Sequence, residues 1–168
     1  SVRSFIIDKD SSLLVGVNGL GFGQYALAEK EFIQYTSLPR FRDLPRNLNA
    51  ATCFMLDEKE NLWIGTRYDG LFMIDQNNGK TYHYLEYDSV TGDRSRMINS
   101  IYEDRFHHIW VGTATGLFKF VQAEAGSSFR IYRFLPETGN PNSISGSYIS
   151  SIFEDSVSNI WVGTVGGS

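Results

Sequence analysis

Short runs of apolar and polar residues, separated by turn residues, follow one another along the whole chain. In "INSIYED", residues 98–104, both sides of the extended segment carry apolar side chains, which is typical of a strand covered on both faces. "HIWVGTA" predicts a second strand over 108–114, "GLFKFV" a third over 116–121 and "SFRIYRFL" a fourth over 128–135. We find no apolar stripe with helical spacing over ten residues, so the pattern predicts an all-β chain.

This pattern occurs four times in register. The copies read "SFIIDKDSSLLVGVNGLGF" (4–22), "CFMLDEKENLWIGTRYDGLF" (53–72), "SIYEDRFHHIWVGTATGLF" (100–118) and "SIFEDSVSNIWVGTVGG" (151–167). An aspartate recurs at intervals of 49, 47 and 51 residues, and a glycine follows each aspartate by eight residues. A tryptophan precedes that glycine by two residues in three copies, and Leu14 takes its place in the first. The recurring residues are Asp8, Asp57, Asp104, Asp155, Gly16, Gly65, Gly112, Gly163, Trp63, Trp110 and Trp161.

Four short antiparallel strands in each period of about fifty residues predict a β-propeller, whose blades are four-stranded sheets. The blades are expected over 1–48, 49–96 and 97–147, and a half blade over 148–168. A four-stranded solenoid or a stacked sandwich is the alternative. Because closed propellers have 4 to 8 blades, about three and a half blades indicate a partial propeller, a fragment of a larger ring.

The segments "INSIYEDRFHHIWVGTATGLFKF" (98–120) and "ISSIFEDSVSNIWVGTVGG" (149–167) resemble the two-component regulator propeller repeat. The resemblance covers essentially the whole chain, although the first copy lacks the tryptophan. It implies a part of the large periplasmic sensor region of a hybrid two-component protein, followed elsewhere by a transmembrane helix and a histidine kinase. Relatives of that kind respond to oligosaccharides, and related repeats precede diguanylate cyclase domains.

The residues that recur in every copy are expected to serve the blade itself. The aspartates Asp57, Asp104 and Asp155 suit hairpin turns, because their carboxylates accept hydrogen bonds from nearby backbone N–H groups. Glycines 65, 112 and 163 leave room for a close neighbour. The tryptophans Trp63, Trp110 and Trp161 are expected to fill space between blades.

Composition limits the classes of function. The net charge of −4 and the lack of a basic segment argue against nucleic acid as a partner. The single cysteine, Cys53, allows no disulfide within the chain and is expected to be a small buried residue. No apolar run approaches 18 residues, so we expect membrane attachment only through a parent protein.

The sequence predicts no metal, no cofactor and no catalytic site. His107 and His108 are neighbours, which point to opposite faces if they lie on a strand, and no metal-binding spacing surrounds them. Glu103 and Asp104 would likewise face apart, which makes a poor glycosidase pair. A lyase or hydrolase would need a group of non-repeated ionisable residues at one mouth of the propeller.

The loops that do not repeat remain as candidates for ligand binding. They cover 36–50, 87–97 and 136–148, with the short turns 67–69 and 114–115. Sugar recognition uses aromatic rings and planar hydrogen-bonding groups, which these loops supply. The predicted ligand-binding residues are Arg67, Tyr68, Asp69, Arg94, Arg96 and Tyr148.

The resemblance therefore implies a periplasmic, ligand-sensing fragment of a receptor that responds to oligosaccharides, and the residues predict no enzymatic activity of its own. The alternative is a protein-interaction or dimerisation scaffold of a receptor with another output, such as a diguanylate cyclase. Since an open arc of blades leaves unpaired strand edges, self-association through those edges is also expected.

Overall fold

The computed structural model describes residues 1–8, 11–17, 21–46, 48, 50–86, 97–123 and 128–166. The first sheet contains β1 (Val2–Ile7), β2 (Leu13–Val17), β3 (Gly21–Ala26) and β4 (Glu31–Gln34), followed by the short 3₁₀ helices η1 (Tyr35–Ser37) and η2 (Pro39–Phe41). The second contains β5 (Ala51–Leu56), β6 (Leu62–Thr66), β7 (Leu71–Ile74) and β8 (Thr81–Tyr84). The third contains β9 (Ile98–Glu103), β10 (Ile109–Thr113), β11 (Gly116–Gln122) and β12 (Phe129–Phe134). Strands β13 (Tyr148–Glu154) and β14 (Ile160–Val165) form the last.

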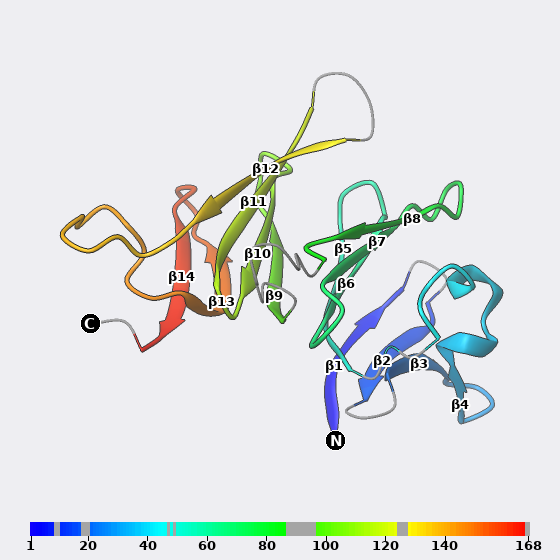
Figure 1. Cartoon of the computed structure of the whole chain (residues 1–168). Helices are drawn as coiled ribbons and strands as arrows, with labels where there is room; N and C mark the ends of the chain where they lie inside the picture. The colour runs from blue at the N-terminus through cyan, green and yellow to red at the C-terminus, as the bar shows by residue number, and fades with distance from the viewer. Residues whose placement is uncertain are drawn as a thin grey trace.

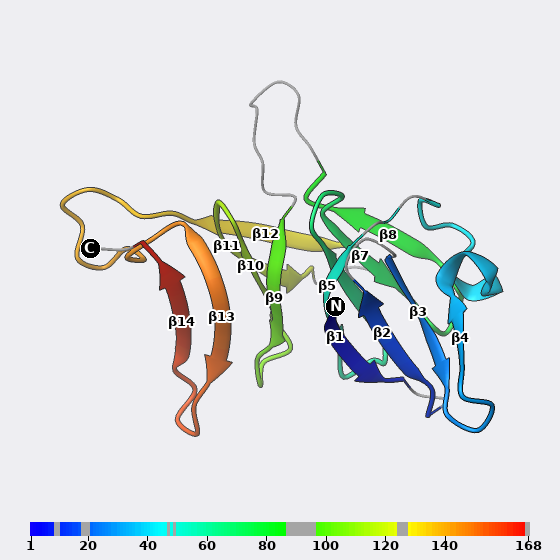
Figure 2. The same cartoon turned by 90° about the horizontal axis from the view of Figure 1, so that it is seen from below.

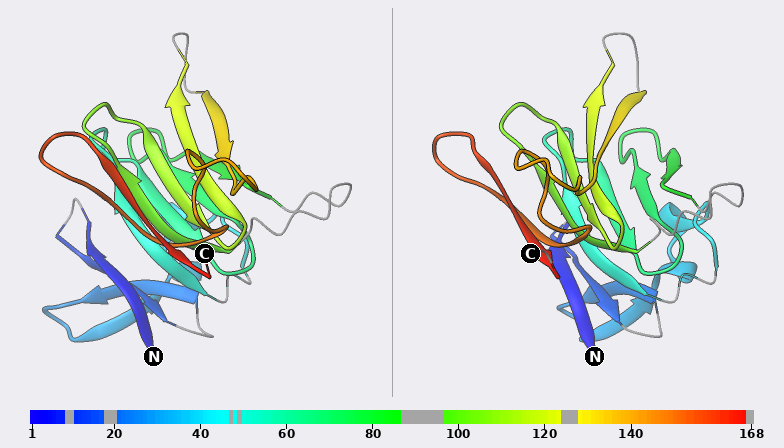
Figure 3. Two further views of the ribbon diagram at one scale, coloured as in Figure 1. Left: turned by 90° about the vertical axis from the view of Figure 1, so that its left-hand side faces the viewer. Right: turned by 60° about the vertical axis from the view of Figure 1, so that its left-hand side comes forward.

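Each sheet is antiparallel, and its strands pair in sequence order. Three sheets have four strands, and β13–β14 has two. The sheets follow one another as an open arc (Figures 1 and 2), with the first strands β1, β5, β9 and β13 packed side by side. Seen from the side, successive sheets lie face to face (Figure 3). This arrangement confirms the predicted all-β propeller fragment of about three and a half blades.

The core lies between the blades, because the strands of the middle blades are apolar on both faces. All residues of β6 and β7 are buried. Successive side chains along a strand point toward opposite neighbouring sheets. Ile64 belongs to the apolar cluster shared with the first sheet, and Trp63 belongs to the cluster shared with the third. Each such fully buried side chain contributes roughly 1.5–3 kcal/mol. Among the described residues, no helix is long and apolar enough to cross a membrane.

The first hairpin of every blade has the same turn. The backbone N–H of the aspartate donates to the carbonyl four residues on, and the residue three positions on donates back to the aspartate carbonyl. That third residue has a left-handed φ of 61–71° in all four copies, at Ser11, Glu60, His107 and Ser158. The turn therefore needs a residue that tolerates this conformation, and side chains of different types occupy the position.

The recurring aspartate carboxylate holds this turn closed. In the third blade, one Asp104 oxygen accepts from the backbone N–H groups of Phe106 and His108, both at 2.9 Å. The other oxygen accepts from Trp110 Nε1 at 2.8 Å and is 2.9 Å from His108 Nδ1. Asp57 and Asp155 make the same set of bonds, with Asn61 and Asn159 in the place of the histidine. Their tryptophan partners are Trp63 and Trp161, each at 2.9 Å.

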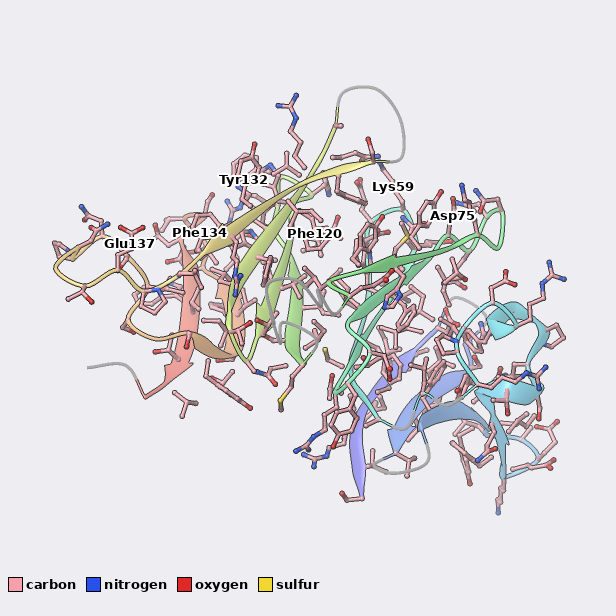
Figure 4. The ribbon with its side chains drawn as sticks, in the orientation of Figure 1. Lys59, Asp75, Phe120, Tyr132, Phe134 and Glu137 are labelled. Atoms are coloured by element: carbon pink, nitrogen blue, oxygen red, sulfur yellow. The ribbon has the colours of Figure 1, made fainter. Side chains whose placement is uncertain are left out.

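The burial of the tryptophans depends on the next blade. Trp63 is fully buried, and its ring lies 5.9 Å from that of Phe120 and 5.6 Å from that of Phe129. Figure 4 shows Phe120 on the side of the third sheet that faces the second. Trp161 differs from the expected burial, since 61% of it is exposed. No described residue of the chain forms a blade beyond β14 that would cover it.

The recurring glycines allow the first strand of the next blade to come close. A Cβ on Gly65 would lie 2.7 Å from Ile98 Cγ2, and one on Gly112 would lie 2.7 Å from Ile149 Cγ2. Both distances are shorter than carbon atoms tolerate. Glycine at this position therefore sets the spacing between neighbouring blades.

Candidate functional site

A pocket of about 240 Å³ opens where the first strands of the blades begin. Its volume is a little below the roughly 300–1,000 Å³ of most ligand sites, which suits one end of a ligand. The lining residues come from all four blades. They are Arg3, Ala50, Thr52, Arg67, Met97, Asn99, Tyr148 and Ser150.

Four of these residues occupy the same position in the repeat. Arg3, Thr52, Asn99 and Ser150 each stand five residues before the recurring aspartate. Each is also the residue at which the pairing of the first two strands shifts, so it is an extra residue in the first strand. Bulges of this kind re-aim a side chain. One bulge per blade thus turns one side chain into the mouth of the propeller.

Three of the four bulge side chains are held by hydrogen bonds. Thr52 Oγ1 donates to the carbonyl of Ile98 at 2.5 Å, and Asn99 Nδ2 donates to that of Ile149 at 2.8 Å. Both bonds cross to the first strand of the next blade. Ser150, for which no next blade is described, donates to the carbonyl of Gly163 within its own blade at 3.1 Å. Thr52 and Asn99 therefore line the mouth and also join neighbouring blades.

Two of the residues predicted to bind ligand, Arg67 and Tyr148, meet at this pocket. Arg67 follows β6, and its backbone N–H donates to the carbonyl of Ala50 on the same rim at 3.0 Å. The Tyr148 hydroxyl lies 3.5 Å from Asn99 Oδ1. In the other copies the positions equivalent to Arg67 include Ala114 and Val165, so the arginine is particular to the second blade.

The other predicted ligand-binding residues do not line the pocket. Tyr68 is 56% exposed in the β6–β7 turn, 5.6 Å from the Arg67 guanidinium, and the Asp69 N–H donates to Thr66 Oγ1 at 2.9 Å. Arg94 and Arg96 lie outside the described residues. The bulge residues Arg3, Thr52, Asn99 and Ser150 were missed, although their fixed distance from the aspartate was visible in the repeat.

An arginine in the loop 36–50 has a structural partner instead of a place at the mouth. The Arg40 guanidinium bonds to the buried Asp8 carboxylate at 2.5 Å and to Gln24 Oε1 at 3.2 Å. Gln76 of the second blade donates to the other Asp8 oxygen at 3.0 Å. Since Leu14 replaces the tryptophan in this blade, Arg40 supplies the donor that the carboxylate otherwise receives from an indole.

The adjacent acids Glu103 and Asp104 serve different blades. Asp104 closes its own turn, whereas Glu103 accepts from the backbone N–H of Glu58 in the second blade at 2.8 Å. Glu154 does the same for the N–H of Arg105 at 3.0 Å, and its other oxygen pairs with the Arg105 side chain at 2.8 Å. Glu103 and Glu154 therefore join neighbouring blades.

The histidine pair lies in the hairpin turn between β9 and β10, and not on a strand. The left-handed φ of 61° at His107 separates the two rings. His108 bonds to Asp104, whereas His107 Nδ1 lies 3.1 Å from both Glu103 and Glu58. These three side chains are close enough to share a metal ion, beside a pocket of about 150 Å³ between the second and third blades. Sequence reasoning missed this group because it joins two turns 45 to 49 residues apart.

The pKa values of the recurring groups follow from their bonds. Burial raises the pKa of Asp104, but the hydrogen bonds from Trp110 and His108 outweigh it and leave the pKa below 3.8. Bonds from Trp161 and Asn159 lower the pKa of Asp155 to about 2. Burial raises the pKa of the Cys53 thiol to about 12, so it is protonated at neutral pH and unsuited to nucleophilic chemistry.

Comparison with protein families finds one family model that matches two segments of this chain. The model described as "Two component regulator propeller" matches residues 92–115 and 143–166. These segments hold the first two strands of the third and fourth blades. Over these two segments, the match agrees with the resemblance to the two-component regulator propeller repeat. A search of curated protein sequences finds no match.

Solved structures show the same fold. The extracellular domain of a protein described as a hybrid two component system, BT4673 of B. thetaiotaomicron, is 24% identical with a TM-score of 0.74 over 98% of this chain. A second such domain, BT3049 of the same organism, is 21% identical with a TM-score of 0.57 over 99% of the chain. The chain spans only 20% and 26% of these two domains. Virginiamycin B lyase of Staphylococcus aureus is 14% identical, with a TM-score of 0.63 over 96% of this chain and 48% of the enzyme.

Proposed function

We propose that this chain is part of the periplasmic sensor region of a hybrid two-component receptor and contributes an oligosaccharide-binding surface. The family repeats support a place in two-component signalling, and the extracellular domains of similar fold support a location outside the cytoplasm. The histidine kinase belongs to the parent protein.

The observation that carries the proposal is the mouth pocket. It brings a tyrosine ring, two guanidinium groups and an amide together at the open end of four repeated strands. Pockets with an aromatic surface and a few convergent polar groups are typical of small-ligand sites. The non-repeated residues Arg67 and Tyr148 give this mouth a chemistry that the repeat alone does not dictate.

Binding without catalysis suits the residues that line this pocket. Among the described residues, its lining includes no carboxylate, imidazole or thiol that could act as a general acid, general base or nucleophile. A ligand there changes signalling only if it binds two states of the receptor with different affinity. This chain shares its fold with a lyase, but a shared fold is no evidence of lyase activity, since one fold hosts many functions.

The test is calorimetric titration of the whole extracytoplasmic region that carries this chain against a panel of oligosaccharides. Binding that is weakened by Tyr148→Ala supports the proposal, because the substitution removes the aromatic ring of the mouth. The matched control is Tyr132→Ala, on the exposed outer strand β12. Uniform absence of binding across the panel contradicts the oligosaccharide proposal.

A second candidate function is association with another propeller blade, for which the exposed apolar residues of the last blade provide the observation. Phe153 and Trp161 are each 61% exposed, and Val165 is 60% exposed. The equivalent surface of the second blade, around Trp63, is covered by the third blade. A blade of a second copy would cover the Trp161 surface in the same way, and sedimentation at rising protein concentration measures that association.

A further inference from the structure

We infer that the mouth pocket prefers a sugar bearing an anionic group, a carboxylate or a sulfate ester, over a neutral one. This inference rests on the proposed function and names the class of sugar that the same site would bind. It follows from which hydrogen-bond donors at the mouth are already engaged by the fold.

Three neutral side chains at the mouth already donate to backbone carbonyls. The Thr52 hydroxyl, the Asn99 amide and the Ser150 hydroxyl each donate to a carbonyl of the propeller. A ligand hydroxyl that needed these donors would have to displace bonds that join the blades or close a strand pair. Leaving those carbonyls without a donor would offset the gain from the ligand.

Apart from the Tyr148 hydroxyl and the second N–H of the Asn99 amide, the side-chain donors that remain at the mouth are cationic. Arg3 is exposed and Arg67 is half-buried, and both line the pocket. In the part of the chain that the structure describes, neither guanidinium has a side-chain hydrogen bond or an ion pair. Arg67 is held by its backbone bond to Ala50, and its guanidinium carbon lies 5.6 Å from the Tyr68 ring centre. Its side chain is therefore placed at the rim while its N–H groups stay available.

The charge at the mouth is opposite to that of the chain. The chain has a net charge of −4, yet the described lining of the pocket contains two arginines and no acid. A guanidinium presents parallel N–H donors that match the two oxygens of a carboxylate or sulfate group, and such charged bonds are about twice as strong as neutral ones. Two arginines with no counter-ion among the described residues favour an anionic group in the pocket.

Tyr148 completes the recognition of a sugar rather than of a free ion. Its ring borders the same pocket, and its hydroxyl makes only a long contact of 3.5 Å with Asn99. The aromatic face suits the apolar face of a sugar ring, while the arginines bind the charged substituent. An acidic sugar uses both parts of the site.

The experiment compares three probes on the whole extracytoplasmic region by titration calorimetry. Trigalacturonate carries carboxylates, neocarratetraose disulfate carries sulfate esters without carboxylates, and galactotriose is neutral. We expect at least one charged probe to bind about tenfold or more tightly than galactotriose, as charge-assisted bonds allow. Raising the salt concentration from about 0.05 M to about 0.5 M should weaken only the binding of the charged probes, since exposed charges are screened.

The arginine variants locate the effect. Arg67→Gln should reduce the preference for the charged probe severalfold, and Arg3→Gln together with Arg67→Gln should remove it. Arg130→Gln, an equal change in charge on the exposed strand β12, is the matched control and should leave the preference intact. Circular dichroism and melting curves confirm that each variant is folded.

The outcomes separate the inference from the function on which it rests. If galactotriose binds as tightly as both charged probes, or if the preference survives the double variant, the inference is overturned and the proposed function stands. If none of the probes nor any sugar of the wider panel binds, both are overturned. The two charged probes show whether the anionic group is a carboxylate or a sulfate ester.

Discussion

At the scale of single residues, the aspartate of each first hairpin is the group on which most bonds converge. Its two oxygens accept from two backbone N–H groups, one side chain and one indole in the second, third and fourth blades. A carboxylate that accepts several hydrogen bonds is favoured in its charged form. The stability of the turn should therefore depend on pH.

Replacing Asp104 by Asn should flatten the acid branch of the stability curve. The folded pKa of Asp104 lies below its ordinary value of 3.8. Its contribution is therefore complete above that value and is lost as the pH falls through the lower folded pKa. Urea unfolding between pH 7 and pH 2 should show a smaller loss of free energy in Asp104→Asn than in the parent chain. Equal slopes in both proteins would contradict the role given to the carboxylate, and Asp43→Asn, outside the hairpin turns, is the control.

Two tryptophans with the same hydrogen bond should differ in what they contribute to stability. Trp63→Ala removes a fully buried ring and should cost about 3–5 kcal/mol. Trp161→Ala removes a ring that is 61% exposed, and its cost should stay below about 1 kcal/mol in dilute protein. Denaturant unfolding of the two variants measures the difference, and a similar loss in both would mean that the next blade adds little to tryptophan burial.

At the scale of elements, the second strand of the second, third and fourth blades combines a tryptophan with a glycine two residues later. The tryptophan extends toward the next blade, and the glycine lets the first strand of that blade come close. The bulge opposite then re-aims one side chain per blade into the mouth. The contacts that space the blades therefore also position the residues of the pocket.

Gly65→Ala tests this spacing. The new Cβ would lie 2.5 Å from Cys53 Sγ and 2.7 Å from Ile98 Cγ2, so we expect an overpacking cost of about 1–3 kcal/mol. The matched control is Gly163→Ala, which meets Ser151 Oγ at 2.4 Å but has no side chain of a following blade nearby. The Ser151 hydroxyl can rotate away, so the control should lose less stability in thermal unfolding. A larger loss in the control would argue against glycine as the spacer.

The strands and turns were largely predictable because the sequence contains four copies of one pattern. A single copy of "EDRFHHIWVGT" suggests a chemical site, whereas its sister copies reveal a turn, and the strands over 98–103, 109–113, 116–122 and 129–134 followed. The bonds that cross between blades were not predictable. The Arg40–Asp8 pair and the bond from Glu58 to Glu103 join residues 32 and 45 positions apart, and no local rule gives such pairings.

Only part of the mouth was predictable, because the repeat directed the search for ligand-binding residues to the loops that do not repeat. Arg67 and Tyr148 were selected because their loops do not repeat. The bulge residues stand inside repeated strands and were therefore missed, although their side chains differ from blade to blade: Arg3, Thr52, Asn99 and Ser150. In a propeller, a position can be structurally repeated and still carry variable chemistry. Comparing the variable residues at each repeated position would have found them.

At the scale of the whole molecule, the open arc leaves apolar residues exposed at both ends. Phe5 and Ile7 of the first blade are 69% and 66% exposed, and Phe153 and Trp161 of the last are both 61% exposed. Exposed apolar surfaces of this kind mark sites of protein contact. We expect the isolated chain to associate as its concentration rises, and Trp161→Ala to weaken that association. Light scattering that shows a monomer at all concentrations would contradict the expectation.

The central claim is that the bulged first strands of consecutive blades form a sugar-binding mouth. A crystal structure of the whole extracytoplasmic region grown with trigalacturonate tests it most directly. We expect sugar at the mouth, with a carboxylate bound by Arg3 and Arg67 and a ring against Tyr148. Sugar bound elsewhere, with the mouth free of it, would contradict the account.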